Sequence, residues 1–165
     1  MRVILVTMSD NDVRTFLEHE RGITLITLDC ALAKNDTQNI LEEYIDNAIP
    51  DILITYRCPF ILPSATFSRP RFGAFNIHPS LLPKYPGLNP WGDIFHNKER
   101  EGGVTLHRIT ENVDAGPIIY QATFPIVESD TIESARMKAD YLASKLVERL
   151  IESFSRESRS PYGIP

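Results

Sequence analysis

Short apolar runs alternate with amphipathic segments through the first third of the chain. β-Branched residues dominate the runs 2–7, 23–28 and 51–56, as is typical of buried parallel strands. Between them, segments 12–20 and 38–48 carry apolar side chains at the spacing of a helix face. Neighbouring parallel strands need a crossover connection, usually a helix packed on the sheet, so this order of segments allows few fold topologies. It predicts an α/β fold: an open, Rossmann-like, mostly parallel twisted sheet flanked by helices.

The rest of the chain predicts a smaller antiparallel addition and a long final helix. A short helix over 90–97 precedes a strand over 104–109, and another strand with alternating apolar side chains begins at Ile118. We expect these two strands to form a C-terminal antiparallel pair. Asp130, in a segment that resembles a capping box, is predicted to cap the final helix. The apolar stripe of that helix continues to Phe154.

Composition and charge indicate one soluble domain. Hydrophobic residues make up 42% and charged residues 24% of the 165 positions, as in ordinary globular proteins. The formal net charge of −5 argues against a nucleic-acid or acidic-membrane surface, which needs clustered Lys and Arg. No membrane-spanning run or signal peptide is recognisable, so we expect a cytoplasmic protein. Residues 1–154 are expected to form the domain and residues 155–165 a flexible tail.

Prolines gather in the middle of the chain. Seven of the twelve prolines lie between residues 58 and 90, which excludes long helices there. We expect a loop-rich rim around one further strand. In open parallel sheets, such rims at the carboxyl ends of the strands are where ligands bind.

An amide and an imidazole mark the end of that further strand. If residues 73–77 are extended, Asn76 and His78 share one face and lie roughly 6.6 Å apart. Pro79 favours an extended His78, and the prolines that follow open the strand into a loop. By itself, an Asn-x-His pair at a strand end is usually a satisfied structural pair. With a loop arching over it, the pair is a candidate active site.

Two longer segments carry a resemblance to a known family. They read FNIHPSLLPKYPGLNP over 75–90 and GGVTLHRITENVDAGPII over 102–119. In this order they resemble the formyltransferase family, which includes glycinamide ribonucleotide, methionyl-tRNA and amino-sugar N-formyltransferases. The similarity covers about 50–121 and, more loosely, the final helix. It implies a catalytic domain with a shortened N-terminal half that moves a formyl group from 10-formyltetrahydrofolate to a primary amine.

The resemblance assigns the catalytic roles to Asn76, His78 and Asp114. The chemistry suits these residue types, because an attacking amine makes the formyl oxygen negative and an amide N–H can stabilise that oxyanion. An imidazole can carry the proton from the amine to the departing folate nitrogen. Asp114 is expected to orient His78 or a water molecule and to raise the histidine pKa.

The resemblance also implies where the two substrates lie. The pterin is expected against main-chain atoms of two segments, Phe60, Ile61 and Leu62 in the first and Thr110, Glu111, Asn112 and Val113 in the second. The loop around the acceptor is expected to comprise Ser80, Lys84, Tyr85, Gly87 and His107.

The sequence says less about the amine that accepts the formyl group than about the folate that donates it. The segment 7–13 lacks the glycine-rich loop that cradles phosphate in the ribonucleotide enzymes, and it carries two carboxylates. We therefore favour a small or nucleotide-linked amine, such as an amino sugar or an aminoacyl group. The alternatives are glycinamide ribonucleotide, water in a formyltetrahydrofolate hydrolase, or a folate-binding relative without turnover. The assembly state stays open, a homodimer being one option.

The sequence predicts no metal site. Cys30 and Cys58 are isolated, and we expect both to be reduced thiols. The histidines at 19, 78, 96 and 107 show no ligand spacing. Formyl transfer by an amide, an imidazole and a carboxylate requires no metal ion.

Overall fold

A six-stranded sheet organises the computed structural model, which describes residues 1–8, 11–29, 34–47 and 49–157. The strand order is β2-β1-β3-β4-β5-β6. The first four strands run parallel, and β5 runs antiparallel to both β4 and β6. The predicted α/β class and the C-terminal antiparallel pair are confirmed. The strands are β1 (Arg2–Thr7), β2 (Thr24–Asp29), β3 (Ile52–Tyr56), β4 (Gly73–His78), β5 (Glu101–Arg108) and β6 (Ile118–Pro125).

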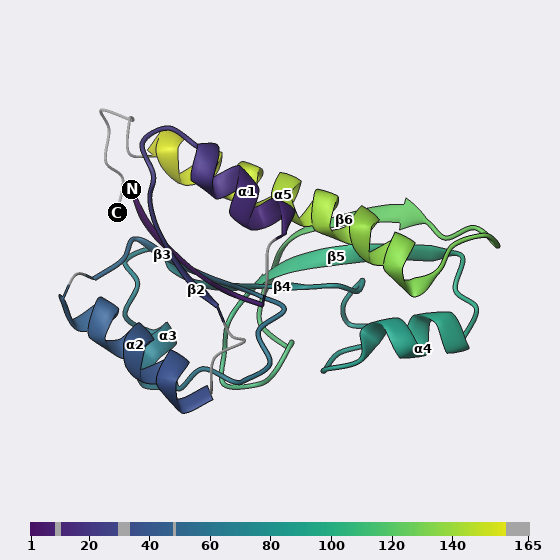
Figure 1. Cartoon of the computed structure of the whole chain (residues 1–165), viewed down its shortest axis with the longest axis horizontal. Coiled ribbons are helices and arrows are strands. Elements are labelled where there is room, and N and C mark those ends of the chain that lie inside the picture. The colour runs from purple at the N-terminus through teal and green to yellow at the C-terminus, as the bar shows by residue number, and fades with distance from the viewer. Residues whose placement is uncertain (9–10, 30–33, 48, 158–165) are drawn as a thin grey trace.

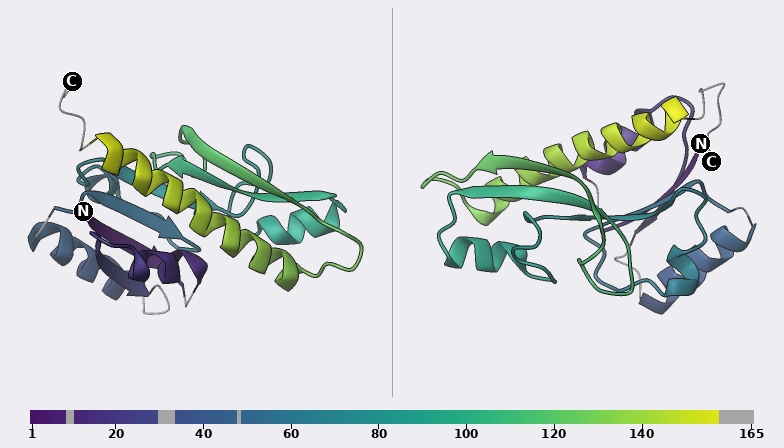
Figure 2. Two further views of the ribbon diagram at one scale, coloured as in Figure 1. Left: turned by 90° about the horizontal axis from the view of Figure 1, so that it is seen from above. Right: turned by 180° about the vertical axis from the view of Figure 1, so that it is seen from behind.

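Helices cover both faces of this sheet. The described helices are α1 (Asp12–His19), α2 (Lys34–Asn47), α3 (Ser64–Phe67), α4 (Pro90–His96) and α5 (Ile132–Glu157). Helices α1 and α5 lie together on one face, and α2 and α3 lie on the other (Figures 1 and 2). The alternation of β1 explains the two layers: Val3 and Leu5 join the core under α1 and α5, whereas Ile4 and Val6 join the core under α2.

The start of α5 corrects the predicted cap. Thr131 rather than Asp130 caps the helix, because the Ser134 N–H donates to Thr131 Oγ1 at 3.2 Å. The Asp130 carboxylate instead accepts the Lys138 ammonium at 2.7 Å and the Val127 N–H at 2.9 Å. Aspartate and threonine are both good caps and are adjacent here, so the sequence pattern could not rank them.

Some predicted boundaries also move. Helix α2 begins at Lys34, four residues before the predicted start, and its described part ends at Asn47. Helix α5 continues through Glu157, so residues 155–157 are helical rather than part of a flexible tail. The remainder of that predicted tail, 158–165, lies outside the described residues.

The contacts of the Asp130 carboxylate are expected to stabilise the fold in a way that is lost in acid. The Lys138 ammonium, the Val127 N–H and the Ser134 hydroxyl lower the pKa of Asp130 to about 2. A carboxylate whose pKa is depressed by folding stabilises the fold above its unfolded pKa of about 4, and that stability is lost as pH falls toward 2. Asp130→Asn is therefore expected to lower the urea midpoint at pH 7 and to match the wild type near pH 2.

The matched control is Glu133→Gln, which removes an exposed partner of Arg136 on the same helix turn. Its midpoint should stay close to the wild type at both pH values, because exposed ion pairs contribute little. An Asp130→Asn deficit that persists undiminished at pH 2 would contradict the electrostatic account.

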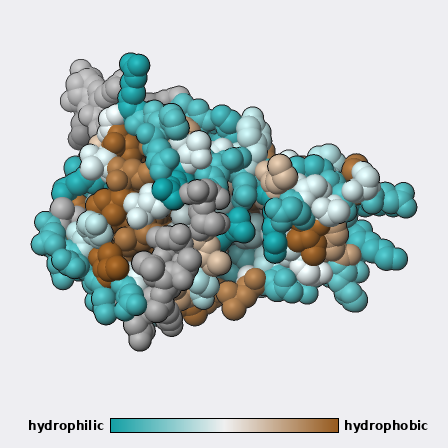
Figure 3. Space-filling view, viewed as in Figure 1, coloured by the Kyte–Doolittle hydropathy of each residue, from teal (hydrophilic) through white to brown (hydrophobic). Residues whose placement is uncertain are grey.

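The surface seen in Figure 3 is apolar mainly at one end of the sheet. Hydrophobic residues gather on the left of the view, over the part where Figure 1 places β2 and α2. β2 is an edge strand, and its residues Leu25 and Ile26 are half-buried. Strands β1 and β3 separate this surface from β4, which carries Asn76 and His78. Among the described helices, none has the length and apolarity needed to cross a bilayer.

Candidate active site

Polar side chains line up across three neighbouring strands near their ends. Asn76 of β4 stands opposite Thr55 of β3 and opposite His107 of β5. Residues directly opposite each other point to the same face of a sheet, so the three side chains share a face. His78 follows two positions after Asn76 on that face, as the sequence predicts. The flanking Phe75 belongs to the core on the other face.

The amide of Asn76 is held by partners on both of its ends. Thr55 Oγ1 donates to Asn76 Oδ1 at 2.8 Å. Asn76 Nδ2 lies 3.1 Å from His107 Nε2 and 3.3 Å from Asp114 Oδ1. His107 Nδ1 lies 2.9 Å from Arg108 O, which can only accept, so this nitrogen carries the proton and Nε2 accepts from Asn76. The network therefore directs the amide N–H₂ toward Asp114.

His78 is fixed between the loop and Asp114. Its Nε2 lies 2.7 Å from Tyr85 O, so Nε2–H donates to that carbonyl. Its Nδ1 lies 3.4 Å from Asp114 Oδ2. Only 5% of His78 is exposed, and burial lowers its pKa below the ordinary value, although Tyr85 O and the Asp114 charge act in the opposite direction. The Asp114 charge thus raises the His78 pKa, as expected, but burial outweighs this effect.

Asp114 reaches both His78 and Asn76 from a tight turn. Its backbone adopts φ +52°, a left-handed conformation that aspartate tolerates better than most residues. The Gly87 N–H donates to its Oδ2 at 2.8 Å. Burial alone would raise the pKa of Asp114, but His107 and His78 in their protonated forms, together with the Gly87 N–H, hold that pKa below its usual value. The carboxylate is therefore ionised at neutral pH.

Gly116 lets this turn close against β5. A Cβ at this position would lie 1.8 Å from Arg108 O, a backbone atom that cannot move aside easily. Arg108 O is also the acceptor of His107 Nδ1. A side chain at Gly116 would therefore displace both the turn that carries Asp114 and the partner of His107.

Gly116→Ala is accordingly expected to cost activity more than stability. A displacement of about 1 Å at a catalytic group can reduce turnover about 100-fold. Gly22→Ala is the matched control, since it also adds one methyl group but meets no atom within 4 Å. At Gly22 the positive φ should cost some stability while kcat is retained. Equal kcat in the two variants would contradict this role of Gly116.

Comparison with known proteins identifies the chain. Residues 3–151 match the sequence model of the family described as formyl transferase. The chain belongs to the formyl transferase family. It is 36% identical over 109 residues to the bifunctional polymyxin resistance protein ArnA of Wigglesworthia glossinidia brevipalpis, covering 66% of this chain and 17% of that protein. It is 36% identical over 110 residues to methionyl-tRNA formyltransferase of Thermotoga neapolitana, covering 67% and 35%.

The chain thus spans about a third or less of these two curated relatives. Solved structures share its fold at lower identity. Phosphoribosylglycinamide formyltransferase of Brucella melitensis aligns with a TM-score of 0.75 and 20% identity, covering 99% of this chain and 97% of that one. A formyltetrahydrofolate deformylase of Pseudomonas syringae also gives 0.75 and 20%, covering 90% and 59%.

In this member of the formyl transferase family, the loop after β4 contributes main-chain atoms to the site. Tyr85 offers its carbonyl to His78, and Gly87 offers its N–H to Asp114. The Tyr85 hydroxyl and the Lys84 ammonium both donate to Glu99, at 2.7 and 3.1 Å. Ser80 is fully buried, and its hydroxyl donates to Lys84 O within the loop. These side chains shape the loop, whereas its backbone faces the site.

The two segments expected to hold the pterin pack against the same core. Phe60 and Ile109, which precedes Thr110, both contact the cluster under α2, in which Leu62 is buried. Apolar side chains remain exposed on both segments, with 65% of Ile61 and 53% of Val113 accessible. Within the second segment, the Thr110 hydroxyl donates to Asn112 O at 3.1 Å, and Glu111 is exposed.

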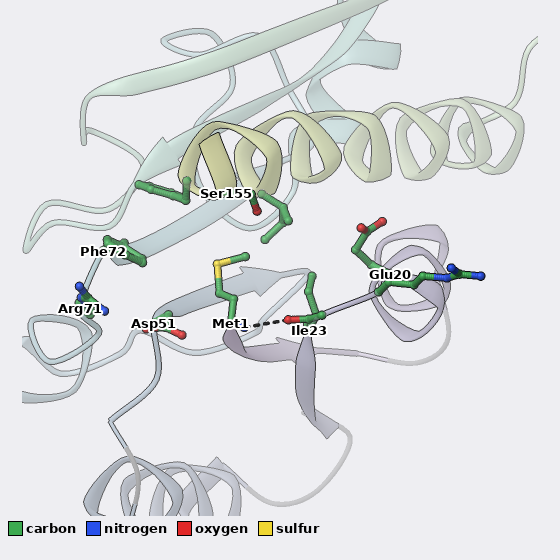
Figure 4. A pocket seen from close by; sticks show the side chains of 11 residues that line it. Met1, Glu20, Ile23, Asp51, Arg71, Phe72 and Ser155 are labelled. Carbon is green, nitrogen blue, oxygen red and sulfur yellow. Dashed lines mark hydrogen bonds between the residues drawn. The ribbon is translucent and has the colours of Figure 1, made fainter. Parts of the chain in front are cut away.

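In the described part of the chain, no cluster of three or more His, Cys, Asp or Glu side chains has the geometry of a metal site. Cys58 is a half-buried thiol, and Cys30 lies outside the described residues. A groove of about 470 Å³ lies at the amino-terminal ends of the strands, where Met1, Ile23 and Phe72 face the end of α5 (Figure 4). The groove and His78, the last residue of β4, therefore lie at opposite ends of the strands.

Sequence reasoning missed three polar residues around the site. Thr55 holds Asn76, while Thr105 Oγ1 donates to Ser80 O at 2.7 Å and accepts from Gln121 Nε2 at 2.9 Å. Threonine is a common strand residue, so its β-branched shape hid its polar role. The available signal was a hydroxyl in an otherwise apolar strand, in register with Asn76.

Proposed function

We propose that this chain transfers a formyl group from 10-formyltetrahydrofolate to the primary amine of a small or nucleotide-linked acceptor, such as an amino sugar. The proposal rests on one observation above all. An amide, an imidazole and an ionised carboxylate converge within 3.4 Å at the carboxyl end of β4, in a chain of the formyl transferase family. We assign the catalytic roles to Asn76, His78 and Asp114.

The tautomer of His78 supplies a base at a defined atom. Because Nε2–H is held by Tyr85 O, the lone pair of the neutral imidazole is on Nδ1. The lowered pKa keeps this nitrogen unprotonated at pH 7. As the amine attacks the formyl carbon, Nδ1 takes the amine proton, and Asp114 Oδ2 at 3.4 Å stabilises the imidazolium. The same proton then passes to the departing folate nitrogen as its bond to the formyl carbon breaks.

The amide of Asn76 provides the oxyanion donor. Its N–H toward Asp114 Oδ1 spans 3.3 Å and is the weaker of its two contacts. This N–H would turn to the formyl oxygen as negative charge develops there. One such donor contributes ~3 kcal/mol to the transition state.

The residues at the start of α1 argue against a phosphate group bound there. Asn11 Oδ1 accepts the Arg14 N–H at 3.0 Å, so a side chain already caps the helix, and the acidic Asp12 follows. Ser9 and Asp10 lie outside the described residues. The net charge of −5 also argues for a small acceptor rather than tRNA. We place the reaction in the cytoplasm, with the folate and the amine as partners.

Release of tetrahydrofolate tests the proposal. The protein is incubated with 10-formyltetrahydrofolate alone, with an amino-sugar nucleotide, or with glycinamide ribonucleotide. We expect release that depends on an amine and is strongest with the amino-sugar nucleotide. Amine-independent release would indicate hydrolysis, and release only with glycinamide ribonucleotide would revive that acceptor. No release under any condition would overturn the proposed activity.

A further inference from the structure

Thr55 is a buried polar residue that the proposed reaction does not yet use. It lies in β3 among apolar residues, and only 4% of it is exposed. Its hydroxyl lies 2.8 Å from Asn76 Oδ1 and 3.5 Å from Phe75 O. A hydroxyl has a single proton, and the shorter contact identifies Asn76 Oδ1 as its acceptor.

The direction of the Asn76 amide decides whether it can stabilise an oxyanion. In the orientation described, Oδ1 faces Thr55 and the N–H₂ group faces His107 and Asp114. Rotation by 180° would turn Oδ1 toward the Asp114 carboxylate and the His107 lone pair, and would leave the site without an amide donor. When one N–H leaves Asp114 for the formyl oxygen, the contacts with Thr55 and His107 still define the amide plane.

We propose that Thr55 is a positioning residue for formyl transfer, which fixes the Asn76 amide with its N–H₂ toward the reacting carbon. This inference rests on the proposed function, because it gives Thr55 a role through the oxyanion donor. Thr55 donates to the oxygen end of the amide, and His107 accepts from the nitrogen end. The two neighbours on β3 and β5 thus hold the amide from opposite sides of β4.

Two substitutions separate the hydroxyl from the shape of the side chain. Thr55→Val has nearly the same volume but no hydroxyl, so Asn76 Oδ1 loses this donor. We expect kcat to fall about tenfold to 100-fold, at most the ~10²–10³-fold effect of losing an oxyanion donor. Thr55→Ser keeps the hydroxyl and should restore kcat to within about threefold of the wild type. KM for the folate should not change in either variant, because neither substitution touches Phe60–Leu62 or residues 110–113.

A double-mutant cycle tests whether Thr55 acts through Asn76. In an Asn76→Ala background there is no amide to position, so adding Thr55→Val should reduce kcat no further. Additive losses, an unchanged kcat in Thr55→Val alone, or equal losses in the valine and serine variants would each overturn the proposal. A low kcat in Asn76→Ala with the same folate KM as the wild type would support the oxyanion role on which it rests.

A readout without turnover keeps this inference separate from the proposed function. The side-chain N–H₂ resonances of Asn76 can be assigned in a nitrogen-labelled protein by their absence in Asn76→Ala. We expect Thr55→Val to shift or broaden them and Thr55→Ser to leave them near their wild-type positions. Unchanged resonances in Thr55→Val would overturn the positioning role even in an active enzyme. A shift in a protein without formyl transfer would support the contact while the proposed function fails.

Discussion

Asp114→Asn is expected to reduce turnover by about 10²–10⁴-fold, the range for loss of general acid–base assistance. Asparagine keeps the shape of aspartate and tolerates the left-handed backbone at this position, with φ +52°. Its side-chain oxygen can still accept the Gly87 N–H, so the loop is retained. The substitution removes the negative charge opposite His78 and also replaces Oδ1, the acceptor of the Asn76 N–H, by an amide N–H₂ group. The measurement is single-turnover transfer at saturating folate, with the urea midpoint as the control for folding.

The pH profile of the same variant gives a second test. The Asp114 charge raises the pKa of His78, although burial makes the net shift downward. Removing the charge should lower this pKa further and move the acidic limb of the profile to lower pH. The wild-type limb itself should lie below pH ~6.5, the ordinary histidine value. A limb that moves to higher pH in Asp114→Asn would contradict the assigned contact.

His78→Gln is the second substitution with a large expected effect. The glutamine amide can still donate to Tyr85 O, but it has no basic nitrogen. We expect turnover to fall by about 10²–10⁴-fold and the acidic limb of the pH profile to disappear. His19→Gln, at an exposed position on α1, is the matched control and should retain wild-type kcat. Near-normal turnover of His78→Gln would rule out the imidazole as the base.

The same variant should alter stability in acid. Because folding lowers the pKa of His78, the unfolded chain binds this proton more readily below pH ~6.5. Wild-type stability therefore falls as pH drops from about 6.5 toward the folded pKa. His78→Gln lacks this contribution, so its urea midpoint should decline less over that range. An identical decline in both proteins would contradict the buried, neutral state of His78.

The sheet could be predicted because local patterns encode it. The run 2–7 is apolar on both faces, and the structure buries both faces of β1 between helices. The ends of helices were harder to predict. Asp130 and Thr131, for example, are adjacent, and both residue types can cap a helix. The Asp130 carboxylate accepts a hydrogen bond from the Lys138 ammonium instead of capping the helix, and Lys138 is eight residues away in the sequence.

The proximity of Asn76, His78 and Asp114 could be expected in advance, but the balance of electrostatic effects on His78 could not. The resemblance to the formyltransferase family implies that Asp114 lies near His78, and its charge alone would raise the histidine pKa. Burial has the larger effect, and it depends on packing that no local pattern reveals. Thr55 was missed for a similar reason, since its partner Asn76 is 21 residues away and on a neighbouring strand.

The fate of the formyl carbon tests the central claim most directly. A carbon-labelled formyl group on 10-formyltetrahydrofolate is followed in the presence of a nucleotide-linked amino sugar, with wild type and Asp114→Asn compared side by side. We predict that the wild type places the label in an amide of the acceptor and that the variant leaves it on the folate. Label recovered only as formate, or equal transfer by both proteins, would contradict formyl transfer by Asn76, His78 and Asp114.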